Sequence, residues 1–267
     1  MTLTPPDSKK ARLEYSERFP DVLKCNGSPE ARYIDGSTVF GSRRPWVKYM
    51  DQFYTAKEKE KLKFIVVVRE PVSRDYSWYS QVIRDRLGRE GFRFKELHTL
   101  DETRRPGLPP VWYTHVERNG DYVRQLKNYL QFFRRDQLLI LTSSALFRNS
   151  SKIMDNISKF LDIENPPVWS GAFPHDDHLG YFAGIAECIT KYTPKLSCSY
   201  KEELARYYEP LNEEFYNLLK ETQPLASKWE PPFEPFGDSW KNIKCVDDAR
   251  KELDKLIASS SKRSCIK

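Results

Sequence analysis

The sequence contains little glycine and no long hydrophobic run, and each shortage excludes a class of protein. Only 11 of the 267 residues are glycine, and they form no glycine-rich loop of the Walker type. No apolar run is long enough to span a bilayer as a helix, and neither internal repeats nor low-complexity segments occur. These residues therefore encode no transmembrane helix and no repeat array, and a nucleotide kinase that depends on a Walker loop is excluded.

Cysteine and histidine are too scattered to indicate a metal site. The five cysteines follow no metal-ligand spacing, and only two of the four histidines, His175 and His178, lie close together. They stand in Pro-His-Asp-Asp-His, where metal binding can be imagined, but no third ligand is evident and a solvated polar turn accounts for them. We predict no metal site.

Aromatic residues, by contrast, are abundant. The 15 Tyr, 15 Phe and 6 Trp can build the core of one α/β domain of this length. The net charge of +6 agrees only weakly with an anionic partner, because basic and acidic residues are mixed along the chain. We expect a disordered polar N-terminus at 1–10 that is neither signal peptide nor anchor, a folded domain at 11–240, and a charged C-terminal helix or tail at 241–267.

The most informative stretch begins with an apolar run from Phe64 to Val68 that is rich in β-branched residues. Such a run, with no polar alternation, is typical of a strand buried on both faces of a parallel sheet. Arg69 follows at the carboxyl end of this strand, where open α/β sheets bind their ligands. Pro71 then suits the first turn of a helix, because its missing N–H would have no intrahelical partner.

Arg69 and Ser77 can face one anion from this strand–loop–helix unit. Ser77 lies eight residues after Arg69, about two turns into the predicted helix. A guanidinium fork and a hydroxyl are both suitable donors to a phosphate group. The alternative is that Arg69 pairs with Glu70 and that Ser77 is an ordinary exposed helix residue.

The amino-acid sequence of this segment resembles the 3′-phosphate-binding segment of sulfotransferases that use 3′-phosphoadenylyl sulfate (PAPS). The segment reads Val-Val-Arg-Glu-Pro-Val-Ser-Arg-Asp-Tyr-Ser-Trp-Tyr. It is most similar to the Golgi heparan sulfate and related carbohydrate sulfotransferases. The resemblance implies a P-loop-NTPase-like parallel sheet flanked by helices, with PAPS as sulfuryl donor and PAP as product. It assigns the 3′-phosphate to Arg69 and Ser77.

Other segments correspond to the family less completely. Asp35, Ser37 and Thr38 stand where the family lines its acceptor site, and a simple polar β-turn is the alternative. The polar segment from Arg84 to Pro110 is expected to be a loop whose Arg84 and Arg86 contact an anionic carbohydrate, or else a solvated basic loop. The family's loop that closes over the nucleotide corresponds to Thr190, Lys191 and Tyr192.

Several further elements are predicted from apolar spacing. We expect helices over Trp46–Tyr54, Gly120–Phe133 and Ser151–Leu161, and a second buried strand over Leu138–Leu141. The segment Leu204–Tyr216 matches the terminal helix of the sulfotransferases. For the Gly-x-Tyr helix at Gly120 we expect a packing role and assign no chemistry.

Two parts of the family pattern have no counterpart in these residues. The Lys-x-Gly-Thr type of loop that cradles the 5′-phosphosulfate does not occur, and neither does the family's first strand–loop–helix unit with its catalytic glutamate. The catalytic residue is therefore unknown. The first hypothesis is a sulfotransferase that acts on a hydroxyl or amine of a carbohydrate. The alternative is a non-catalytic module that binds a nucleotide or a sulfated glycan.

Cellular location follows only from indirect signals. Cys188 and Cys198 are close enough in sequence to form a disulfide, which would require an oxidising compartment, whereas free thiols would suit the cytoplasm. Sequons at Asn26, Asn149 and Asn156 favour a secreted glycoprotein. The resemblance implies the Golgi lumen or membrane. A cytoplasmic location is the alternative, since we find no signal or anchor in this sequence.

Overall fold

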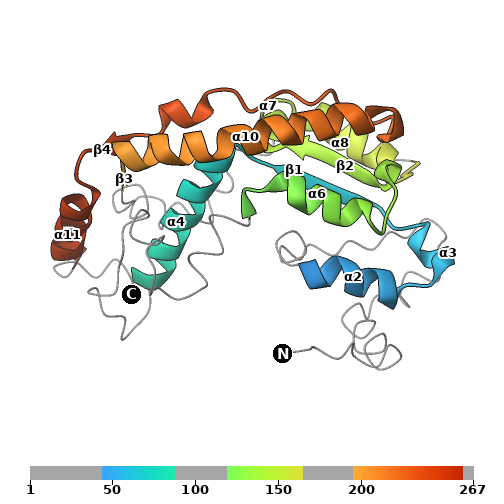
Figure 1. Ribbon diagram of the computed structural model, residues 1–267, viewed down its shortest axis with the longest axis horizontal. Helices are drawn as coiled ribbons and strands as arrows, with labels where there is room; N and C mark the ends of the chain where they lie inside the picture. The colour runs from blue at the N-terminus through green and yellow to red at the C-terminus, as the bar shows by residue number, and fades with distance from the viewer. Residues whose placement is uncertain (1–43, 88–118, 165–194, 261–267) are drawn as a thin grey trace.

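The computed structural model describes residues 44–87, 119–164 and 195–260 (Figure 1). Strands β1 (Phe64–Val68) and β2 (Leu138–Thr142) lie side by side in parallel, with Phe64 paired to Leu138 and Val68 paired to Thr142. Helices pack on this pair, so the predicted α/β class with parallel strands flanked by helices is confirmed. The helices are α2 (Arg44–Phe53), α3 (Ala56–Lys59), α4 (Pro71–Leu87), α6 (Tyr122–Leu130), α7 (Ser143–Arg148), α8 (Ser150–Phe160), α10 (Cys198–Thr222) and α11 (Ala249–Ser260).

One face of the β1–β2 pair is well covered. Phe64, Val66 and Val68 of β1 and Leu138 and Ile140 of β2 point to the same side, as alternate residues of a strand must. They pack against α2, α6 and α10, and the ring of Phe64 lies 5.2 Å and 4.7 Å from the rings of Tyr129 and Phe133. Among the described residues, this cluster is the largest part of the core.

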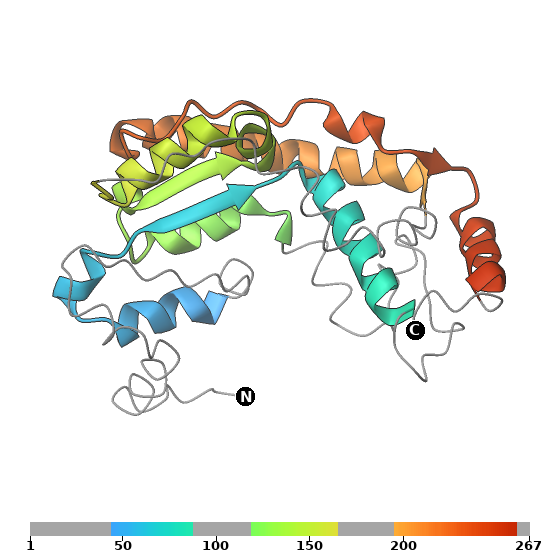
Figure 2. The same cartoon turned by 180° about the vertical axis from the view of Figure 1, so that it is seen from behind.

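The opposite face is covered over β2 but not over β1. Leu139 and Leu141 are buried against Ile153 and Phe160 of α8, whereas Ile65 and Val67 of β1 are 37% and 48% exposed. Figure 2 shows α8 over β2 while β1 runs uncovered in front of it. The prediction that the Phe64–Val68 strand is buried on both faces is therefore wrong for the described residues, because no described helix packs on this side of β1.

The remaining predicted elements occur close to their expected bounds. The second strand is buried at all five positions, as predicted. The expected helices over Trp46–Tyr54, Gly120–Phe133 and Ser151–Leu161 correspond to α2, α6 and α8, and the expected terminal helix is part of the 25-residue α10. Asp121 and Thr142 cap α6 and α7 by accepting hydrogen bonds from the N–H groups of Arg124 and Ala145, which explains where these helices begin.

A second, two-stranded sheet connects α10 to the C-terminal segment. Strand β3 (Leu196–Ser197) pairs in parallel with β4 (Cys245–Val246), and a disulfide joins Cys198 to Cys245 with the two Cα atoms 5.0 Å apart. The predicted pairing of Cys188 with Cys198 is wrong, because the Cys198 sulfur is bonded to Cys245. Cys188 lies outside the described residues. Strand pairing brings together residues 47 positions apart, which proximity in the sequence could not indicate.

A buried ion pair closes the outer edge of β2. Arg135, in the 3-10 helix η4 (Arg135–Gln137), and Glu230 have side chains that are 1% and 2% exposed and bind each other through two hydrogen bonds of 2.9 and 2.5 Å. The same guanidinium donates to the carbonyl of Leu138 and to the hydroxyl of Thr222. Glu230 also accepts the N–H of Ile140, so a segment far along the chain occupies the edge of the strand.

No helix in the three described stretches is both long and apolar enough to cross a membrane.

Candidate functional site

Arg69 is the first residue beyond the parallel ladder. The last paired residues are Val68 and Thr142, and Arg69 stands exposed at the carboxyl end of β1, as the sequence predicts. Within the described stretches, no ion pair or hydrogen bond engages its guanidinium. Arginine at the carboxyl edge of a parallel sheet, with its donors exposed to solvent, is suited to bind an anion.

Glu70 has a different partner from the one considered in the sequence. Its carboxylate accepts hydrogen bonds from the N–H groups of Val72 and Ser73, at 2.8 and 2.7 Å, and from the Ser73 hydroxyl at 2.7 Å. These N–H groups belong to the first turn of α4 and have no intrahelical acceptor. Glu70 therefore caps α4 and is 94% buried, and in the described part of the chain no ion pair joins it to Arg69.

Ser77 lies on the exposed side of α4. Val72, Asp75 and Tyr79 form the buried side of this helix, whereas Ser77 and Gln81 face solvent. Ser77 is six residues beyond Pro71, so it lies about 9 Å along the helix axis from the first residue of α4. Both residues of the predicted phosphate site are thus exposed on one strand–turn–helix unit, with Arg69 at its turn and Ser77 on its helix.

The turn that carries Arg69 is fixed from α6. The Tyr122 hydroxyl donates to the Arg69 carbonyl at 2.7 Å and accepts from the Arg69 N–H at 3.3 Å. Tyr122 is 92% buried, and burial raises the pKa of its hydroxyl to about 12, so it remains a neutral group that can donate and accept. From the sequence we expected only a packing role for Tyr122, because a tyrosine on the apolar face of a helix does not reveal what its hydroxyl binds.

A polar network surrounds the buried carboxyl group of Asp75 in α4. Asp75 is fully buried, receives a hydrogen bond from the Arg74 guanidinium at 2.8 Å and another from the Tyr208 hydroxyl. Burial raises the pKa of Asp75 to about 7, although Arg74 and both hydrogen bonds act in the opposite direction. Burial and the nearby Asp75 also raise the pKa of Tyr208. One feature of the sequence could have indicated this network: Asp75 lies on the same side of the helix as the apolar residues Val72 and Tyr79.

Close packing holds α10 against the start of α6 at this network. A Cβ atom on Gly120 would lie 2.4 Å from the ring of Tyr208, so no larger residue fits there without displacing the ring. Asp75, Tyr208 and Gly120 thereby join α4, α10 and the start of α6. Because Tyr122 follows Gly120 by two residues, this contact also helps to place the hydroxyl that binds Arg69.

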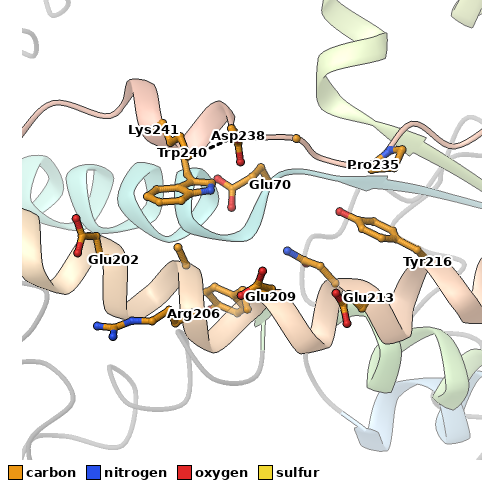
Figure 3. Close-up of a pocket in the computed structure, with 14 residues that line it drawn as sticks. Glu70, Glu202, Arg206, Glu209, Glu213, Tyr216, Pro235, Asp238, Trp240 and Lys241 are labelled. Atoms are coloured by element: carbon orange, nitrogen blue, oxygen red, sulfur yellow. Dashed lines mark hydrogen bonds and ion pairs between the residues drawn. The ribbon is translucent and has the colours of Figure 1, made fainter.

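A cavity of about 570 Å³ opens between α10, the first turn of α4 and the segment around η6 (Ser239–Asn242). Figure 3 shows the Glu70 carboxylate beside Trp240, above a row of side chains from α10. The charged residues that line the cavity are five carboxylates and two cations: Glu70, Glu202, Glu209, Glu213, Asp238, Arg206 and Lys241. Because carboxylates predominate and neither Arg69 nor Ser77 lines it, this cavity does not suit phosphate groups.

The other residues predicted to bind ligands are placed only in part. Asp35, Ser37 and Thr38, and also Thr190, Lys191 and Tyr192, lie outside the described residues. Arg84 and Arg86 fall within α4, which continues to Leu87. The prediction that a loop begins at Arg84 is therefore wrong, because no glycine or proline interrupts helix formation between Pro71 and Gly88. In the described ranges, no group of three His, Cys, Asp or Glu side chains could hold a metal ion.

Comparisons with known proteins identify the family to which this sequence is similar. Residues 47–170, which include β1, Arg69, α4 and β2, match the family model described as the sulfotransferase domain. This chain is a relative of the sulfotransferases. The resemblance to sulfotransferases drawn from the Arg69–Ser77 segment is thus confirmed. The similar proteins include heparan sulfate sulfotransferases.

Two of these sulfotransferase relatives show how much of each chain is aligned. The mouse (Mus musculus) bifunctional heparan sulfate N-deacetylase/N-sulfotransferase 4 is 29% identical over 187 residues, which cover 62% of this chain and 20% of that protein. The chain thus spans about a fifth of the length of such relatives. The human (Homo sapiens) heparan sulfate glucosamine 3-O-sulfotransferase 5 is 22% identical over 247 residues, or 80% of this chain and 69% of that protein.

A solved sulfotransferase structure is also similar. The crystal structure of the sulfotransferase from Alicyclobacillus acidocaldarius matches 69% of this chain and 63% of its own, with a TM-score of 0.45 and 22% identity.

Proposed function

We propose that the Arg69–Ser77 unit binds the 3′-phosphate of PAPS or PAP. The observation that carries this proposal is the exposed Arg69 guanidinium, which has no partner among the described residues and extends from a turn fixed by Tyr122 and Glu70. A fixed turn supports binding because little conformational freedom is lost when the ligand arrives. The Ser77 hydroxyl would add one donor from α4. The proposal concerns the 3′-phosphate alone, since the sequence lacks the loop type that cradles the 5′-phosphosulfate.

We propose further that the chain takes part in sulfuryl transfer to a hydroxyl or amine of a carbohydrate, namely a glycosaminoglycan. The printed names of its relatives, which act on heparan sulfate, support this substrate class. PAPS would supply the sulfuryl group. Asp35, Ser37, Thr38, Arg84 and Arg86 are the proposed acceptor contacts. Thr190, Lys191 and Tyr192 are proposed contacts to the nucleotide, and we assign no residue as the catalytic base.

The location we propose is the Golgi lumen. The Cys198–Cys245 disulfide supports an oxidising compartment. Asn149, the first residue of a sequon, is exposed between α7 and α8, where a glycan could be attached.

Transfer of labelled sulfate tests the proposed activity. The purified chain is incubated with ³⁵S-labelled PAPS and either N-desulfated or fully sulfated heparan sulfate, and label on the polymer is counted. We expect incorporation that requires a free amine or hydroxyl and that is lost in Arg69→Ala. Binding of the polysaccharide without incorporation would instead support the alternative, a non-catalytic module that binds sulfated glycans.

A further inference from the structure

Arg69 directly follows the last residue of β1. Val68 is the last residue of β1 that is paired with β2, and Arg69 follows it outside the strand. Buried or partly buried backbone groups need hydrogen-bond partners. The Tyr122 hydroxyl binds the Arg69 backbone, accepting from the N–H at 3.3 Å and donating to the carbonyl at 2.7 Å. A single side-chain atom thus binds both polar backbone groups of this residue.

Tyr122 is itself held rigidly. Its ring lies 5.7 Å from the ring of Phe215 and 5.9 Å from that of Phe236, both of which belong to the aromatic cluster between α6 and α10. Asp121, the residue before it, caps α6 through the N–H of Arg124. Because both the ring and the backbone are fixed, the position of the hydroxyl, and with it that of the Arg69 backbone, is determined by the core.

Binding geometry depends on such support. A side chain that must meet a phosphate with two parallel N–H donors needs its own backbone placed accurately, and a displacement of about 1 Å can weaken the interaction severely. Glu70 fixes the following residues by capping α4, but no other described side chain binds the polar backbone atoms of Arg69.

We infer that Tyr122 is a positioning residue for anion recognition, whose hydroxyl holds Arg69 so that its guanidinium discriminates nucleotides that carry a 3′-phosphate from those that do not. This inference rests on the proposed function. It assigns a role in specificity to a residue on the packed face of α6, distant in sequence from the Arg69–Ser77 segment.

The substitution Tyr122→Phe tests this role because it removes the hydroxyl and retains the ring. Titration calorimetry measures the affinity for PAP and for adenosine 5′-phosphate, which lacks the 3′-phosphate. We expect the affinity for PAP to fall about tenfold and that for adenosine 5′-phosphate to stay the same, so that the ratio of the two affinities decreases. A variant that was merely less stable would lose affinity for both nucleotides equally.

Tyr129→Phe is the matched control. Tyr129 is a buried tyrosine on the same helix, two turns further on, and its ring packs on Phe64 and Phe133 instead of reaching Arg69. Its affinity ratio should equal that of the wild type. An unchanged ratio in Tyr122→Phe, with discrimination intact in the wild type, would overturn the positioning role and leave the proposed function standing. Absence of discrimination in the wild type would overturn the proposed function instead.

Hydrogen exchange tests the support of the turn without any ligand. The Arg69 amide should exchange about tenfold faster in Tyr122→Phe than in the wild type or in Tyr129→Phe, because its acceptor is gone. Equal exchange rates in all three proteins would contradict the inference even if PAP does not bind.

Discussion

Arg135 and Arg69 stand at opposite ends of the same pair of parallel strands, and their side chains are used in opposite ways. Arg135 precedes β2, is buried, and directs its donors to Glu230, Leu138 and Thr222. Arg69 follows β1, is exposed, and has no side-chain partner among the described residues. The arginine at the amino edge of this sheet therefore holds the fold together, whereas the guanidinium of the arginine at the carboxyl edge is exposed to solvent.

The edges of the two strands differ in the same way. The outer edge of β2 is closed by Glu230, which accepts the Ile140 N–H. The side chains of β2 are buried on both faces of the sheet. On β1, Ile65 and Val67 remain partly exposed, at 37% and 48%. The half of the sheet that includes β2 is therefore the stable support, and the half that includes β1 carries the proposed ligand site.

The largest effect is expected from breaking the structural arginine pair. Glu230→Gln leaves the Arg135 charge buried without a counter-ion, and the free energy of unfolding should fall by about 3–5 kcal/mol. Urea denaturation measures this change. Glu234→Gln is the matched control, since Glu234 pairs with Arg148 at the surface with both side chains more than half exposed, and its loss should cost at most about 1 kcal/mol. Equal effects of the two substitutions would contradict the structural role of Arg135.

The Arg74 side chain is 24% exposed and lies between the buried Arg135 and the exposed Arg69 in this respect. Its contribution to stability is expected to depend on pH through its partner. Its partner Asp75 has a pKa raised by burial from 3.8 to about 7. A raised pKa means that the folded state holds the proton more tightly, so the stability contributed by the protonated carboxyl is complete below pH 3.8 and is lost as the pH rises to 7. Asp75→Asn cannot lose a proton, so its stability relative to the wild type should increase between pH 4 and pH 8.

Urea denaturation at several pH values measures that difference. Asp238→Asn removes an exposed carboxylate that pairs with Lys241 and serves as the control. A stability difference between Asp75→Asn and the wild type that does not change with pH would show that Asp75 does not titrate in this range.

A smaller effect is expected on the helix side of the proposed phosphate site. Ser77→Ala removes one hydroxyl donor, and the affinity for PAP should fall about fivefold, or roughly 1 kcal/mol, with little change in stability because the side chain is exposed. Calorimetric titration with PAP measures it. Gln81→Ala, one turn further along the same exposed side of α4, should bind PAP as the wild type does. A loss in Gln81→Ala equal to that in Ser77→Ala would place the phosphate elsewhere.

The sequence predicted those elements that depend on local pattern. The apolar runs at Phe64–Val68 and Leu138–Leu141, together with Pro71, were sufficient to place β1, β2 and the start of α4. The end of α4 was predicted too early, because polarity was taken as a sign of a loop although arginines favour helices.

Contacts between distant residues could not be predicted in this way. Arg135 and Glu230 are 95 residues apart, and Tyr122 and Arg69 are 53 apart, so neither spacing nor composition relates them. The same reason explains the wrong cysteine pairing, since Cys245 reaches Cys198 only through the pairing of β3 with β4. The exposure of Ile65 and Val67 likewise depends on where α8 packs.

Calorimetric titration of PAP into the wild type, Arg69→Ala and Arg148→Ala tests most directly whether the arginine at the carboxyl edge is the one that binds a ligand. Arg148→Ala removes the same charge from another exposed position and controls for net charge. We expect micromolar binding by the wild type and by Arg148→Ala, with a loss of about thirtyfold or more in Arg69→Ala and no change in its stability. Binding by Arg69→Ala as tight as that of the wild type, or no binding by the wild type, would contradict the account.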